Sequence, residues 1–194
     1  MVEALVEKPT SRDHLTVVDL VLIAMIAAAF GAIGLHLLLF TEALRFSFGF
    51  YGSMITGGLF QVPGILAGAL VRKRWAAFMA QNLFGVTQFL LGVPVGLLVL
   101  GFTASEAIGQ EVVFRAFRRH MGDWRVWGLA AAGSWICAQV PNYAFYGLGR
   151  MAWWSTMGPI LIVGIPSSIF FCTFLTAAVV RAAQKSGLLP KEEI

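Results

Sequence analysis

The 194-residue sequence has few charged residues, since Asp, Glu, Lys and Arg together make up only 12% of it. Soluble domains carry about a quarter of such residues, roughly twice this share. Hydrophobic residues make up 58% of the chain, which excludes a soluble globular domain. At about 20 residues per membrane crossing, the apolar stretches suffice for roughly five to seven helices. Any binding or chemistry therefore takes place inside a helix bundle.

Cysteine and histidine are scarce as well. The two cysteines, Cys137 and Cys172, lie in separate apolar runs, so they form neither a disulfide framework nor a cluster of metal ligands. The three histidines, His14, His36 and His120, are scattered along the chain. We therefore expect no metal site and no cofactor.

The missing histidines also bear on catalysis. No histidine follows His120, so the later helices supply neither the metal ligands nor the serine–histidine pair of an intramembrane protease. No glycine-rich phosphate-binding motif is present, so the chain does not hydrolyse ATP itself. We predict that the protein is not an enzyme.

The sequence does contain a series of apolar runs separated by short polar connections. They predict six transmembrane helices, over residues 16–40, 50–71, 75–91, 95–114, 126–147 and 159–181. The expected fold class is an all-α integral membrane protein, a bundle of six transmembrane helices. No repeat divides the chain, so residues 1–194 are expected to form a single membrane domain.

Basic residues gather on one side of this topology. With both termini in the cytoplasm, only Arg45 and Arg150 of the fourteen Lys and Arg residues are external. The positive-inside rule therefore favours cytoplasmic termini in a multi-pass protein of the cell membrane. It also explains the +4 net charge without a nucleic-acid partner.

Two carboxylates lie in the fourth predicted helix, Glu106 near its middle and Glu111 closer to the cytoplasm. A charge at bilayer depth costs several kcal/mol, so it faces the bundle interior, where it is paired or functional. Five residues turn a helix by about 140°, so the two carboxylates do not share a face. Each contacts either a ligand or a structural partner, and Glu106 is the stronger ligand candidate.

The third and fifth predicted helices each carry a stripe of amide and aromatic side chains at helical spacing. The residues are Gln81, Phe84 and Gln88 in the third helix and Trp135, Gln139, Asn142 and Tyr146 in the fifth. Amides that fix orientation and flat rings that supply area suit a ring-shaped solute. Hydrogen bonds between helices are the alternative explanation. We predict that both stripes converge with Glu106 on one cavity that opens outward.

Small residues recur every four positions in the first predicted helix, at Ala24, Ala28 and Ala32, with others beside them. Small side chains allow close approach of another helix in a membrane. The stripe serves either packing inside the bundle or docking of a partner membrane protein.

Three motifs lie between residues 57 and 117: a basic pair followed by Ala-Ala within residues 72–77, Leu-Leu-Gly-x-Pro at 90–94, and Gly-x-Glu-x-Val-Phe at 109–114. In these motifs the chain resembles the S components of energy-coupling factor (ECF) transporters. Among these it is most similar to the YkoE-like group, which is related to thiamin and hydroxymethylpyrimidine.

The resemblance implies a prokaryotic membrane subunit that captures a small vitamin-like heterocycle on the outer face, such as thiamin or its pyrimidine precursor, for ATP-driven uptake. It also implies that Ala24, Ala28 and Ala32 dock on a transmembrane coupling subunit, which sits on two ATPase subunits. Glutamine at positions 81 and 88, where thiamin-type members carry carboxylates, leaves a neutral pyrimidine possible. The alternative function is a stand-alone secondary transporter or channel that uses Glu106 as a proton or cation site.

Overall fold

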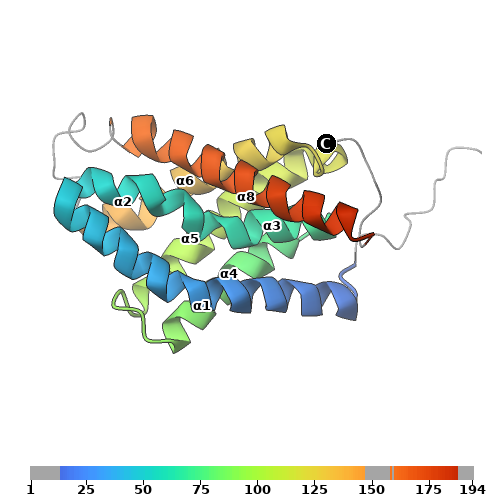
Figure 1. Cartoon of the computed structure of the whole chain (residues 1–194), viewed down its shortest axis with the longest axis horizontal. Coiled ribbons are helices and arrows are strands. Elements are labelled where there is room, and N and C mark those ends of the chain that lie inside the picture. The colour runs from blue at the N-terminus through green and yellow to red at the C-terminus, as the bar shows by residue number, and fades with distance from the viewer. Residues whose placement is uncertain (1–13, 147–157, 159, 188–194) are drawn as a thin grey trace, which may run out of the picture.

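The computed structural model describes residues 14–146, 158 and 160–187, and its regular elements are all helical, as predicted (Figure 1). The elements are α1 (Val17–Phe48), α2 (Phe50–Thr56), the 3-10 helix η3 (Gly57–Gln61), α3 (Val62–Val71), α4 (Ala76–Leu90), α5 (Leu98–Ala116), the 3-10 helix η4 (Arg118–His120), α6 (Trp124–Tyr146), the π-helix η6 (Ile160–Gly164) and α8 (Ile165–Lys185).

Helix α1 extends eight residues beyond the predicted end at residue 40, to Phe48. No glycine or proline interrupts residues 41–48, and Glu42 pairs with Arg45 across 3.5 Å on the same turn. The helix ends only at Gly49, which adopts a positive φ of 63°. The segment predicted as an external connection is therefore a continuation of the helix.

The second predicted helix, over residues 50–71, is interrupted. It consists of α2, the 3-10 turn η3 and then α3. Pro63 lies in the first turn of α3, where its missing N–H removes one helical donor. The interruption leaves backbone groups near the centre of the bundle that need partners from elsewhere.

The remaining predicted helices agree with the structure to within a few residues. The range 75–91 corresponds to α4, and 126–147 corresponds to α6. Helix α5 begins at Leu98 rather than residue 95, because Gly92 and Gly96 adopt positive φ in the preceding turn. The last predicted helix begins as the π-helix η6 and runs four residues further than expected, to Lys185.

Three stretches of the described chain are long and apolar enough to cross a membrane: Val17–Phe48, Tyr51–Val71 and Ile160–Lys185. Helix α4 has only 15 residues, and α5 carries two glutamates, so these helices do not stand out by length and composition. The count of six crossings, with both termini cytoplasmic, stays a prediction.

Helix α5 packs between α4 and α6, while α1 lies against α2, α3 and α4. Helix α8 covers α6, α3 and η3. The main core cluster includes Ile23, Ile65, Phe114 and Trp127, all fully or almost fully buried. The indole of Trp127 donates to the carbonyl of Met121 at 2.7 Å, which ties α6 to the loop before it.

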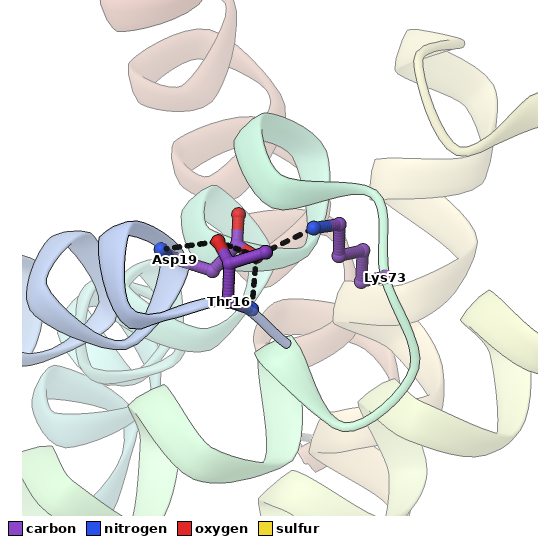
Figure 2. A network of polar contacts seen from close by, with 3 residues as sticks. All are labelled: Thr16, Asp19 and Lys73. Atoms are coloured by element: carbon purple, nitrogen blue, oxygen red, sulfur yellow. Dashed lines mark hydrogen bonds and ion pairs between the residues drawn. The ribbon is translucent and has the colours of Figure 1, made fainter. Parts of the chain in front are cut away.

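The N-terminal end of α1 is fastened to the turn between α3 and α4 (Figure 2). Thr16 and Asp19 form a capping box, in which each side chain accepts from the backbone N–H of the other. The same Asp19 carboxylate binds Lys73 Nζ at 2.6 Å. This contact fixes α1 near the C-terminal end of α8, at the same end of the bundle (Figure 1).

Candidate ligand-binding site

Glu106 and Gln81, predicted from separate helices, meet directly in the centre of the bundle. Gln81 Nε2 donates to Glu106 Oε2 at 2.7 Å. Both side chains are buried, so the carboxyl nearest the middle of α5 has a polar partner, as membrane-buried carboxyls require.

Gln81 also spans the interruption of the second helix. Its Nε2 donates to the Phe60 carbonyl at 2.9 Å, and its Oε1 accepts from the Gly64 N–H at 3.1 Å. In an unbroken α-helix this N–H would donate to the carbonyl of Phe60 four residues earlier. The amide of Gln81 therefore stands between the two backbone groups and satisfies both, and with Glu106 its hydrogen bonds all go to protein groups.

A second glutamine, Gln110, supports the same broken segment one turn further along α5. Its Nε2 donates to the Gln61 carbonyl at 3.1 Å and to Ser134 Oγ on α6 at 3.2 Å. Gln110 Oε1 has no partner among the residues that the structure describes. Helix α5 thus contributes Glu106 and Gln110 to one buried polar layer.

Gln61 is a member of this layer that the sequence analysis missed. Its side chain is completely buried, and within the described part of the chain both of its amide atoms lack a hydrogen-bond partner. A buried unpaired polar group costs about 1 to 3 kcal/mol, which makes this amide a candidate ligand-binding group. Its position in an otherwise apolar stretch of residues 57–71 was a signal that could have identified it.

On α6, Trp135 acts as a wedge between two interrupted segments. Its ring lies so close to Gly57 of η3 and Gly164 of η6 that a Cβ at either position would collide with it. Its Nε1 donates to the carbonyl of Ile160 at 3.0 Å, so the indole holds the π-helix in place.

The amides of α6 form a ladder beyond this indole. Gln139 Nε2 donates to the Trp135 carbonyl at 2.9 Å, and Asn142 Nδ2 donates to Gln139 Oε1 at 3.1 Å. The structure therefore brings these three predicted residues together. Tyr146 ends α6, and its side chain lies outside the described part of the structure.

Phe84 and Gln88, the other two residues of the α4 stripe, lie against α1. Both approach Gly34, and the Nε2 of Gln88 is buried without a partner among the described residues. Helix α5 packs against both α4 and α6, and of the two stripes Gln81 is the residue that bonds to its Glu106. Convergence of both stripes on one cavity stays a prediction.

Glu111 has structural partners at the end of the bundle near Lys73. Its Oε1 accepts from the Trp75 N–H at 2.9 Å and from Arg115 Nε at 3.0 Å. The buried carboxylate therefore links the start of α4 to the end of α5, which favours the structural explanation for Glu111.

The small residues of α1 divide between two faces. Ala27, Gly31 and Gly34 are buried, and Gly31 lies against Thr87 of α4. The stripe of Ala24, Ala28 and Ala32 is exposed. Packing inside the bundle thus uses the first set and leaves the second free, while docking through the second set stays a prediction.

Comparison with known proteins defines the class. A solved structure described as an S-component of an ECF transporter superimposes with a TM-score of 0.84, covering 90% of this chain and 88% of that chain at 22% sequence identity. The fold is therefore that of an S component. A Bacillus subtilis (strain 168) protein whose name describes it as an HMP/thiamine permease, YkoE, is 25% identical over 176 residues, covering 88% of this chain and 85% of the relative.

Residues 18–137 match the family model described as the permease component of the ABC-type cobalt transport system, and the chain belongs to that family. The resemblance to ECF S components seen in the sequence is thereby confirmed. The protein is a membrane transport subunit and not an enzyme.

Proposed function

We propose that the chain is the substrate-binding subunit of an ECF importer in a prokaryotic cell membrane and captures a small nitrogen heterocycle from outside the cell. Thiamin or its pyrimidine precursor is the favoured substrate. The name of the Bacillus subtilis relative supports this chemistry, and the S-component fold supports the binding role.

The observation that carries the proposal is the buried polar layer around Glu106. Gln61 offers an amide donor and acceptor, and Gln110 offers a carbonyl oxygen, all buried without partners in the described chain. Gln88, whose Nε2 is also unpaired among the described residues, lies against α1 instead. An aminopyrimidine presents ring nitrogens and an amino group in one plane, which amides and a carboxyl can bind from several sides.

Cobalt, which the family description names, fits these groups poorly. Cobalt and similar metals select imidazole, thiolate and carboxylate ligands. Among the residues that the structure describes, no group of three or more His, Cys, Asp or Glu side chains could hold a metal ion. The donors around Glu106 are amides, so an organic ring suits them better than a metal ion.

Transport requires partners in this proposal, because the buried layer provides binding but no energy source. The exposed Ala24, Ala28 and Ala32 face is the proposed contact with a transmembrane coupling subunit carried by two ATPase subunits. If the protein instead worked alone as a secondary transporter through Glu106, uptake would not depend on ATP or on these subunits.

Titration of the purified protein with thiamin, hydroxymethylpyrimidine and Co²⁺ tests the proposal. We expect the protein to bind a heterocycle and not the metal. Glu106→Gln and Asn142→Ala should each weaken the affinity for the heterocycle about 5- to 150-fold, because losing a buried polar partner costs about 1 to 3 kcal/mol. Glu111→Gln is the control and should leave affinity unchanged, because Glu111 binds Trp75 and Arg115 instead. Normal binding by both site variants would refute the site.

A further inference from the structure

The turn between α3 and α4 has an unusual backbone. Arg72 and Trp75 adopt positive φ of 53° and 69°, the only non-glycine residues of the described chain that do so. This left-handed conformation costs a residue other than glycine roughly 1 to 2 kcal/mol. The strain places an indole at the start of α4 with 49% of its surface exposed, and strain of this kind clusters at functional positions.

The buried carboxylate of Glu111 holds this turn and an arginine together. It accepts the Trp75 N–H and the Nε of Arg115, and the Arg115 guanidinium lies 4.0 Å from the centre of the Trp75 ring. The Arg115 side chain is 41% exposed, so part of the guanidinium is accessible from outside the bundle. Glu111 and Trp75 thus hold Nε and one face of the guanidinium, which restricts the rotation of its terminal nitrogens.

The surface next to this guanidinium is apolar. Ile108, Val112 and Arg115 follow one another on one face of α5 at spacings of four and three residues. Ile108 is 52% exposed and Val112 is 61% exposed. This surface is apolar along Ile108 and Val112 and positively charged at Arg115, next to the half-exposed indole of Trp75. It therefore complements a phospholipid, in which apolar acyl chains end at a charged headgroup.

We propose that Trp75 and Arg115 form a binding site for an anionic phospholipid. The phosphate binds the terminal nitrogens of Arg115, and an acyl chain lies along Val112 and Ile108. The exposed Arg74 and Arg119 nearby in the chain add positive charge at the same end of the bundle, which favours anionic over zwitterionic headgroups. The apolar stripe favours a lipid over an acidic protein segment, which has no acyl chain to place there.

Native mass spectrometry of the full chain with phosphatidylglycerol and phosphatidylcholine of identical acyl chains tests this site. We expect preferential retention of phosphatidylglycerol and about a fivefold weaker retention in Arg115→Gln, the loss for one basic residue at a membrane surface. Trp75→Leu should weaken it as well. Arg115→Lys keeps the charge and the pairing with Glu111 but cannot stack a planar group on Trp75, so its lipid retention should lie between those of the wild type and Arg115→Gln. This variant also serves as the test if Arg115→Gln does not fold.

Arg181→Gln is the matched control. Arg181 lies near the end of α8 and follows the exposed Phe170 and Phe174 at helical spacing, so it too combines a basic group with an apolar surface. A similar loss in this variant would show that net charge alone is recognised and would overturn the site. Displacement of phosphatidylglycerol by excess inorganic phosphate would also overturn the site. Equally strong retention of a polyglutamate peptide would do so as well. Heterocycle binding should be unchanged in the Arg115 and Trp75 variants whether or not they lose lipid, so this test is independent of the proposed function.

Discussion

Gln81 shows how one side chain serves both the fold and the candidate site. Its amide satisfies Phe60 and Gly64 across the helix interruption and binds Glu106 with its remaining donor. A glutamine is suited to this role because its amide has the same donor and acceptor as a peptide group. The position of Glu106 therefore depends on the broken helix.

Replacing this amide should destabilise the protein. Gln81→Leu leaves the carbonyl of Phe60 and the N–H of Gly64 buried without a partner, so we expect a loss of about 2 to 4 kcal/mol in the free energy of unfolding. Reversible unfolding of the protein in mixed micelles, followed by circular dichroism, measures it.

Asn82→Leu is the control for this measurement. Asn82 is next in the chain, but its side chain donates to the carbonyl of Phe78 within its own helix, at 2.8 Å. Asn82→Leu should lower the free energy of unfolding by less than about 1 kcal/mol. Equal effects of the two variants would mean that the bridging role assigned to Gln81 is wrong.

Helix α5 is the element on which the site depends, because it contacts α4 through Glu106 and α6 through Gln110. It approaches α6 closely at Gly109, which faces the backbone of Gly133. Without a hydrophobic drive between helices in lipid, such close packing is what holds them together. The spacing of the polar layer is therefore set by glycines that carry no chemistry themselves.

A methyl group at this crossing should separate the two helices. Gly109→Ala places its Cβ against the carbonyl of Gly133, and we expect a loss of about 1 to 3 kcal/mol in stability together with weaker heterocycle binding. Gly101→Ala on the same helix meets no atom within 4 Å and should be neutral or stabilising by up to about 1 kcal/mol. A thermal shift of the purified variants compares them, and a stable Gly109→Ala protein would contradict the close crossing.

At the scale of the whole molecule, α1 packs one face against the bundle and leaves its other face exposed. It runs along one side of the bundle (Figure 1) and packs one face against α2, α3 and α4. The ion pair of Asp19 with Lys73 holds its N-terminal end to the turn between α3 and α4. The opposite face of α1 presents Ala24, Ala28 and Ala32. A fixed helix with a smooth outer face suits docking of another membrane helix.

Ala28→Trp tests docking by this face. The bulky side chain would hold a partner helix away, so we expect co-purification with the coupling and ATPase subunits to be lost while heterocycle binding is retained. Ala178→Trp, at an exposed alanine of α8, is the control and should assemble normally. If Ala28→Trp assembles as well as the control, docking does not use this stripe.

The sequence alone determined the properties that depend on solvation and on local periodicity. Scarce charge and long apolar runs identified an all-helical membrane protein, because lipid accepts few other structures. The cost of a carboxyl at bilayer depth singled out Glu106 as buried, and helical spacing placed Trp135, Gln139 and Asn142 on one side of a helix.

Only the tertiary structure decided which groups meet. The bridging amide of Gln81 and the wedge of Trp135 involve partners far apart in the chain, and no local pattern encodes them. Burial likewise separated the inner small residues of α1 from the outer Ala24, Ala28 and Ala32, since both sets recur at helical spacings of three or four residues in the sequence. Packing made that distinction because a small residue permits close approach on any face, and the position of neighbouring helices determines which face is used.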